Sequence, residues 1–176
     1  MDAEPVNMMM TAQSDEEIIE KKKKRIYLYM CSGHSLIAYL IRFITYSFWH
    51  HVAIGIEDEI FEADWDGVVK YKSFDIWQRK RINDHINIIQ LDITEEQYIA
   101  LLKSLDKKLG SPYDYWALLG YLFRTKRLNQ PNKYFCSELI NTCFREIDFN
   151  IIPKRLDWRV TPAQLAIAAY AYSGEN

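Results

Sequence analysis

The chain has 176 residues, of which 49% are hydrophobic, and is long enough to bury one core without disulfides or metals. This composition is typical of a globular domain rather than a disordered segment. A formal net charge of -2 and a pI near 6.1 argue against a dedicated nucleic-acid-binding protein, which usually carries a basic face. We therefore expect a globular domain without a nucleic-acid partner.

The three cysteines, Cys31, Cys136 and Cys143, lack the even number and the paired spacing of a disulfide framework or a zinc site. Free thiols fit a reducing compartment. The stretch before Lys21 is acidic and interrupted by polar residues, so it does not look like a secretory signal. We expect a cytoplasmic protein without metal or cofactor, or a viral or phage product that is delivered otherwise.

The most apolar stretch runs from Ile26 to Trp49 and is interrupted by polar residues. It favours a buried strand followed by a helix over a membrane span, so we expect a soluble protein. Residues 1–25 are expected to form a mobile leader with a short polar helix capped by Ser14. The basic run Lys21–Arg25 fits the solvated end of that helix, with a phosphate- or membrane-binding patch as the alternative.

The remaining residues, 26–176, are expected to form one domain that begins with a strand and a helix. The strand is expected over 26–31. The helix is expected over 35–45, where an apolar stripe recurs at helical spacing through Leu36, Ile37, Leu40, Ile41 and Ile44. Arg42 is expected at the edge of that stripe, with its stem packed and its charged head in solvent.

Three short strands are expected to follow as a meander, over 51–56, 59–63 and 67–71. In a meander the start of one strand lies beside the end of the next. His51 opens the first of these strands and Glu62 lies near the end of the second. The pattern therefore predicts a carboxylate within reach of an imidazole, which is the orienting contact that a catalytic histidine needs.

The next segments predict a mixture of helices and one more strand. A short helix over 73–81 is expected to point Phe74, Ile76 and Trp77 inward, and a strand is expected over 85–91. Thr94 caps a longer helix that Gly110 ends. One face of that helix is expected to consist of Ile99, Leu102, Leu105 and Leu109.

The last third of the chain centres on Cys136. An aromatic-rich helix over 114–123 and a polar loop over 124–133 are expected to lead to it. Apolar residues at helical spacing after Cys136 predict a helix that starts there. Thr161 and Pro162 then mark the start of a final helix, as N-cap and first helical residue.

A cysteine in the first turn of a helix lies at the positive end of the helix dipole, which favours the nucleophilic thiolate. A buried structural cysteine is the alternative, because free cysteine is among the most buried residue types. A nearby histidine that can activate the thiol favours a nucleophilic cysteine over a structural one. Cys136, His51 and Glu62 together can supply nucleophile, base and orienter, with the backbone N–H of Cys136 and a neighbouring donor as an oxyanion hole.

Five segments resemble, in order, the motifs of the YaeF/YiiX-type permuted papain-like enzymes. The first, from Ser35 to Ile54, is a short helix that leads into a strand headed by a histidine. The others are Phe61-Glu62-Ala63 with Gly67-Val68, the turn from Leu109 to Asp114, Phe135-Cys136-Ser137-Glu138-Leu139, and Val160-Thr161-Pro162. The set covers roughly residues 26 to 165.

The resemblance implies an α+β fold, namely a circularly permuted version of the NlpC-type papain-like fold in which the histidine precedes the cysteine. It also implies a cysteine amidase or peptidase with a Cys136–His51–Glu62 triad. Relatives such as the lecithin retinol acyltransferase group transfer acyl chains. A lipid acyltransferase or phospholipase-like activity is therefore one alternative, and a non-catalytic binding module on the same fold is another. The expected substrate is a peptide, an amide or a lipid acyl group.

His50 stands where the family usually has serine. Adjacent residues of a strand point to opposite faces, so only one of His50 and His51 is expected to face Cys136. We assign the base to His51, because its position carries the motif, and expect His50 at the rim. His34 and His85 are expected to be structural or exposed. Cys31 and Cys143 are expected in the core, whereas Tyr113 and Tyr134 either line the cleft or pack.

Overall fold

The computed structural model describes residues 23–115, 132–154 and 160–174. In these ranges the elements, in chain order, are β1 (Lys23–Ser32), α2 (Leu36–Thr45), β2 (His51–Ile56), β3 (Glu59–Asp64), β4 (Gly67–Tyr71), α3 (Phe74–Lys80), β5 (His85–Thr94), α4 (Glu95–Lys108), α6 (Cys136–Glu146) and α7 (Pro162–Gly174). No helix in these ranges is long and apolar enough to cross a bilayer.

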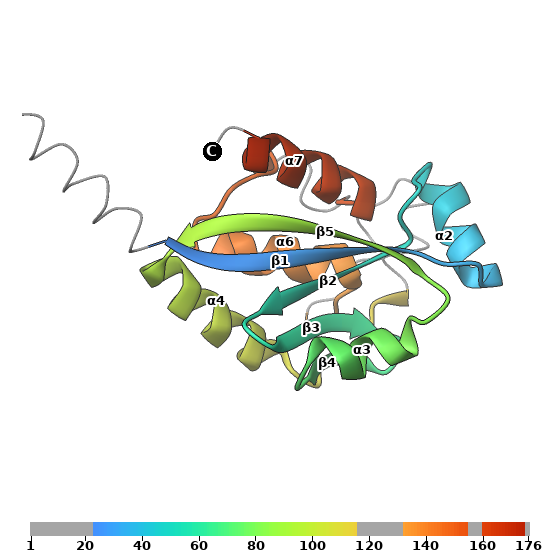
Figure 1. The fold of residues 1–176 in the computed structure, drawn as a ribbon, viewed down its shortest axis with the longest axis horizontal. Helices are drawn as coiled ribbons and strands as arrows, with labels where there is room; N and C mark the ends of the chain where they lie inside the picture. Colours follow the sequence, from blue (N-terminus) through green and yellow to red (C-terminus); the bar gives the residue numbers. More distant parts are fainter. Residues whose placement is uncertain (1–22, 116–131, 155–159, 175–176) are drawn as a thin grey trace, which may run out of the picture.

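The strands form one antiparallel sheet in the order β4-β3-β2-β1-β5. Helices α4, α6 and α7 lie on one side of this sheet, and α3 lies on the other side beside β3 and β4 (Figure 1). The α+β class that the sequence predicts is confirmed. The meander β2-β3-β4 occupies one half of the sheet, as the strand and turn pattern predicted.

Two hydrophobic clusters fill the two faces of the sheet, because successive strand residues point to opposite sides. On β1, Leu28 and Met30 join the large cluster with α4, α6 and α7. Their neighbours Tyr29 and Cys31 join a smaller cluster with Trp77 of α3. One face of the sheet is thus covered by α4, α6 and α7, and α3 covers the part of the other face beside β3 and β4.

The first strand begins earlier than the expected Ile26. Lys23 pairs with Thr94 and Lys24 with Ile93, since β5 continues past the expected Leu91 and offers the basic run a partner. The last residues of the expected polar helix are therefore strand, and its remainder lies outside the described residues. Nearly all of the helix expected over 114–123 and of the loop expected over 124–133 also lies outside the described residues.

Two helices match the core face that their apolar pattern predicted only in part. In α4, Leu105 is buried as predicted, whereas Ile99 is exposed and Tyr98, Leu101 and Lys108 are also buried. Polar anchors turn the helix: the Tyr98 hydroxyl donates to Glu57 at 2.6 Å, and Lys108 Nζ lies 2.6 Å from Glu146 Oε2 of α6. In α3, Trp77 is buried and Phe74 packs against the smaller cluster as predicted, whereas Ile76 faces solvent.

The predicted helix boundaries are accurate where a cap defines them. Thr94 and Gln97 form a capping box at the start of α4. Gly110, at φ +77°, follows the end of that helix. Thr161 accepts from the backbone N–H of Gln164 and starts α7 at Pro162.

Candidate active site

The predicted histidine–carboxylate pair forms between β2 and β3. The ladder joining these strands pairs Ile54 with Phe61, so His51 and Glu62 both occupy the alternate face, since side chains alternate along a strand. His51 Nε2 lies 2.7 Å from Glu62 Oε2. Because the His51 ring is buried and Glu62 is fully buried, their hydrogen bond is shielded from water.

Two residues of the α3 segment hold Glu62 in place. The indole Nε1–H of Trp77 donates to Glu62 Oε2 at 2.8 Å, and Arg81 Nη2 donates to the same oxygen at 3.0 Å. Burial alone would raise the pKa of Glu62. The charge and hydrogen bond of His51, the charge of Arg81 and the indole bond outweigh it and lower this pKa to about 2. Glu62 is therefore an anion at neutral pH.

Arg81 is the centre of a charged cluster that the sequence reasoning missed. Besides Glu62, its guanidinium contacts Asp64 at 3.3 Å and Asp84 at 3.7 Å. Its Nη2 lies 3.1 Å from His51 Nε2, because both nitrogens approach the same carboxylate oxygen. Trp77 was expected to be only a packing residue. The signal that links Trp77 and Arg81 is their i, i+4 spacing, which places both on one face of α3.

Cys136 is the first residue of α6, whose N-cap is Phe135. Helix α6 packs against β2 and β3, so the thiol comes from the helix layer opposite α3 (Figure 1). Cys136 is 4% exposed, and its side chain lies close enough to His51 to raise the pKa of that ring. Since His51 Nε2 is held by Glu62, Nδ1 is the ring nitrogen left for the thiol.

The three predicted residues thus lie together, and their charges set the basicity of His51. Burial and the positive charge of Arg81 each lower the pKa of His51. The charges of Cys136 and Glu62, with the hydrogen bond to Cys136, outweigh them and raise this pKa to about 9. A histidine of this basicity takes a proton from a neighbouring thiol readily. The arrangement can therefore generate a nucleophile at Cys136.

The start of α6 also offers donors for a developing oxyanion. The first backbone N–H groups of a helix have no acceptor within the helix. The N-cap residue Phe135 provides no side-chain cap, and Ser137 turns its hydroxyl away to the carbonyl of Val160 at 2.7 Å. The N-terminal amides beside Cys136 are thus placed as donors in an oxyanion hole.

Two cavities adjoin the triad. A pocket of about 20 Å³ contacts Cys136 itself. A larger one of about 210 Å³ is lined by residues that include His51 and Arg81. Both are lined by Ile41, His50 and Tyr113, so they adjoin each other along the inner side of α2. Tyr113 lines the cleft, which was one of the two roles left open for it.

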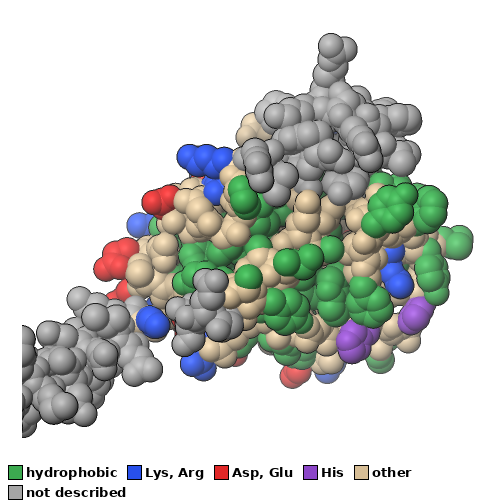
Figure 2. All heavy atoms as spheres, turned by 90° about the horizontal axis from the view of Figure 1, so that it is seen from above, with side chains coloured by type: hydrophobic (Ala, Val, Ile, Leu, Met, Phe, Trp, Pro, Cys, Tyr) green, Lys and Arg blue, Asp and Glu red, His purple; other side chains and the backbone are tan. Residues whose placement is uncertain are grey.

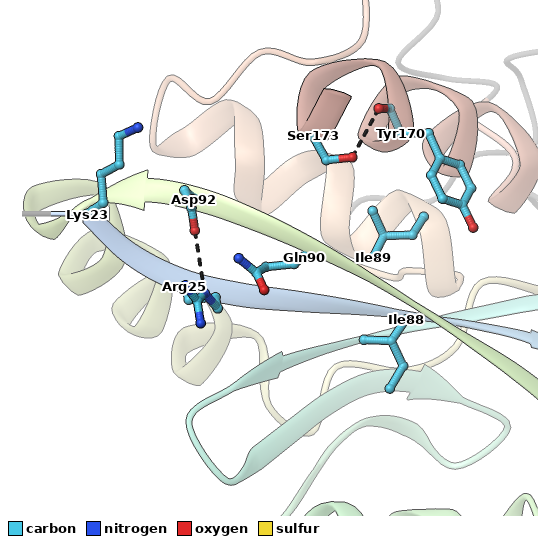
Figure 3. A pocket seen from close by; sticks show the side chains of 8 residues that line it. All are labelled: Lys23, Arg25, Ile88, Ile89, Gln90, Asp92, Tyr170 and Ser173. Carbon is cyan, nitrogen blue, oxygen red and sulfur yellow. Dashed lines mark hydrogen bonds and ion pairs between the residues drawn. The ribbon is translucent and has the colours of Figure 1, made fainter. Parts of the chain in front are cut away.

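A larger cavity, of about 580 Å³, lies elsewhere, over the sheet between β5 and α7. Figure 3 shows its side chains spread along the neighbouring strands β1 and β5 and along α7, with Lys23 and Arg25 on one side and Tyr170 on the other. Its lining holds neither cysteine nor histidine, so it has no nucleophile–base pair. Cys136 and His51 line the two smaller pockets instead.

His50 corrects one expectation. It precedes β2 rather than belonging to it, so strand alternation does not separate it from His51, and both rings line the cleft. Burial, and then the charges of His51 and Arg81, lower the pKa of His50 to about 3. The ring is therefore neutral, its Nδ1 accepts from the Gly33 N–H at 3.1 Å, and its 3.9 Å approach to Asp84 is not an ion pair.

The remaining histidines and cysteines lie where they were expected. His34 and His85 are exposed. Cys31 and Cys143 are fully buried, and burial raises the pKa of the Cys143 thiol to about 11. No three His, Cys, Asp or Glu side chains in the described ranges form a metal-binding group.

No protein-family model matches the chain, and no curated protein matches it. The functional assignment therefore depends on the geometry of the site itself.

Proposed function

We propose that the chain is a cysteine hydrolase that cleaves an amide or ester bond through a thioester on Cys136. The observation that carries the proposal is the buried 2.7 Å bond between His51 and Glu62, with Cys136 close enough to the His51 ring to raise its pKa. Nucleophile, base and orienter in this chain of contacts are the elements of a catalytic triad.

In the first half-reaction Cys136 Sγ attacks the carbonyl carbon of the substrate, while His51 takes the thiol proton. Amides at the start of α6 stabilise the oxyanion, and Glu62 stabilises the imidazolium. His51 then returns the proton to the leaving amine or alcohol as the C–N or C–O bond breaks. In the second half-reaction His51 removes a proton from water, which attacks the thioester and releases the acid and the thiol.

We further propose that the fold is the circularly permuted, NlpC-type papain-like fold. Three features support this assignment. The strand that carries the histidine precedes the cysteine helix along the chain, the cysteine opens that helix, and the helix packs on the sheet beside the histidine strand. The five ordered motif matches from residue 26 to 165 point the same way.

Trapping of the acyl-enzyme tests the proposal. The protein is incubated with p-nitrophenyl esters and amides of short and long acyl chains, quenched in acid, and its intact mass is measured. We expect an added acyl group on Cys136, located by peptide mapping, and none in a Cys136→Ala variant. Turnover without any adduct, or an adduct that persists in the variant, contradicts a thioester mechanism.

A second candidate is acyl transfer to an amine or hydroxyl acceptor, with the same intermediate. The specific observation in its favour is that apolar α2 forms a wall of the cleft, where Ile37, Ala38 and Ile41 line it. Addition of an acceptor alcohol or amine to the trapping reaction separates transfer from hydrolysis. The influence of Cys136 on the pKa of His51 counts against a purely structural module, in which these side chains need not lie close together.

A further inference from the structure

Helix α2 turns an unusually apolar surface to solvent. Leu36 is 89% exposed, Phe43 74% and Tyr46 92%. We define the α2 face as the exposed large hydrophobic residues of this segment, which are Leu36, Ile37, Tyr39, Leu40, Phe43, Tyr46 and Phe48. A surface helix normally places polar residues outward, so this face needs a partner. Figure 2 shows hydrophobic side chains gathered at the end of the molecule where α2 lies.

The helix is apolar on both of its sides. Leu36, Leu40 and Phe43 follow i, i+4, i+7 spacing and form the outer stripe. The two buried residues, Ala38 and Ile41, form the inner stripe and line the cleft beside His51. A single helix therefore separates the outer apolar surface from the cleft that leads to Cys136.

The charges of the α2 face point to one kind of partner. No Asp or Glu occurs between Ser32 and Glu57, and Arg42 is the one Lys or Arg there. Its guanidinium lies 5.5 Å from the ring centre of Tyr39 and 5.3 Å from that of Phe48. Aromatic side chains around a held cation are typical of segments that lie in the headgroup layer of a membrane, where Arg meets anionic lipid.

A second copy of the chain fits this face less well. In a two-fold contact the same patch meets itself, so the two Arg42 cations would approach each other with no carboxylate of either α2 face between them. An acidic peptide would satisfy Arg42 but leave most of the apolar stripe without a partner. An anionic lipid surface satisfies both the charge and the apolar area.

We propose that the α2 face inserts into the headgroup layer of an anionic phospholipid membrane and that the acyl esters of those lipids are the substrates of Cys136. The second half of this statement rests on the proposed hydrolase function. Docking through α2 holds the cleft, which is lined by the inner side of the same helix, next to the membrane surface. Cys136 Sγ then forms a thioester as the ester C–O bond breaks, the lysolipid alcohol leaves with the proton from His51, and water releases the fatty acid.

Vesicle binding tests the docking apart from the chemistry. The full chain is co-sedimented with phosphatidylcholine vesicles with and without phosphatidylserine, at low and high salt. We expect binding to the phosphatidylserine vesicles that weakens with salt, and a Leu40→Gln/Phe43→Gln variant that binds about tenfold or more weakly. The matched control is Ile167→Gln on α7, because Ile167 is 70% exposed far from α2 in sequence, and it should bind as the wild type does.

The two halves of the proposal fail separately. Cys136→Ala should still bind vesicles, and the Leu40→Gln/Phe43→Gln variant should keep the wild-type thermal midpoint and Cys136 alkylation rate in the absence of lipid. Vesicle binding without release of lysolipid from dioleoylphosphatidylserine removes the substrate assignment and keeps the docking. Three results would overturn the docking. They are equal binding by the double variant, binding that does not depend on phosphatidylserine, and a dimer through α2 in sedimentation velocity in place of vesicle binding.

Discussion

A single carboxylate oxygen, Oε2 of Glu62, organises the site at the scale of residues. It accepts from His51, Trp77 and Arg81, at 2.7, 2.8 and 3.0 Å. Three donors on one buried oxygen keep the carboxylate ionised and fix its direction. The fixed carboxylate in turn fixes the His51 ring, and with it the nitrogen that meets Cys136.

Replacing Glu62 by Gln should lower the acylation rate without unfolding the chain. The amide is nearly isosteric, but it carries no charge to stabilise the imidazolium of His51. We expect a fall of about a hundredfold or more in the rate of acyl transfer to Cys136. Burst kinetics with a p-nitrophenyl ester measure it. Glu59→Gln is the matched control because Glu59 lies on the same strand, half-exposed beside Lys70, and its rate should stay at the wild-type level.

The raised pKa of His51 predicts a loss of stability at alkaline pH. The group has a pKa of about 9 in the folded chain and about 6.5 when unfolded. Its protonation therefore stabilises the fold fully below about pH 6.5, and this contribution is lost as the pH rises through 9. Urea unfolding of the wild type should lose on the order of 1–3 kcal/mol more over this range than His51→Gln.

The comparison of the two proteins isolates His51, because tyrosines, lysines and the other cysteines titrate alike in both. Parallel curves for wild type and His51→Gln would show that the ring gains no proton affinity on folding. That outcome would remove the electrostatic basis for His51 as the base.

At the scale of elements, the segments that contain Gly67 and Gly110 are joined by two backbone hydrogen bonds. The N–H of Val68, at the start of β4, donates to the Ser111 carbonyl at 2.9 Å, and the N–H of Gly110 donates back to the Val68 carbonyl at 2.9 Å. Gly67 has φ +104°, and a Cβ there would lie 2.4 Å from the Ser111 oxygen. The contact ties the meander to the turn after α4 that leads to Tyr113, a residue of the cleft.

Gly67→Ala should therefore destabilise the chain by about 2–4 kcal/mol, because it combines a left-handed backbone with a clash against the backbone. Gly110→Ala is the matched variant, since Gly110 has φ +77° but nothing within 4 Å of the added Cβ. It should cost only about 1 kcal/mol. Thermal or urea unfolding measures both, and equal costs would show that the contact with Ser111 does not constrain the fold.

The structure of the whole molecule shows which features a sequence can predict. Alternating apolar residues and turn residues predict the meander. Because neighbouring strands of a meander pair in a fixed register, the same pattern also predicts that His51 and Glu62 lie close together. Caps predict helix starts for the same reason. The faces of α4 and α3 were predicted less well, since buried polar anchors such as Lys108 with Glu146 rotate a helix against its apolar pattern.

Arg81 was missed because its role depends on how α3 packs against β3. No local pattern in the sequence fixes that packing, so neither its contact with Glu62 nor the one made by Trp77 could be predicted. The apolar stripe of α2 was predicted as a helix face, but the sequence does not say which side is covered. In the structure Leu36 and Leu40 face solvent, and this exposure supports the docking proposal.

The proposed chemistry depends most directly on the activation of Cys136 by His51. Timed alkylation by iodoacetamide at neutral pH, followed by peptide mass spectrometry, gives the separate rates of Cys136 and Cys143 in wild type and in His51→Asn. We predict that Cys136 reacts much faster than the fully buried Cys143, and that the His51 substitution slows Cys136 by about tenfold or more while the thermal midpoint shows a folded chain. An unchanged Cys136 rate in the folded variant would contradict the account.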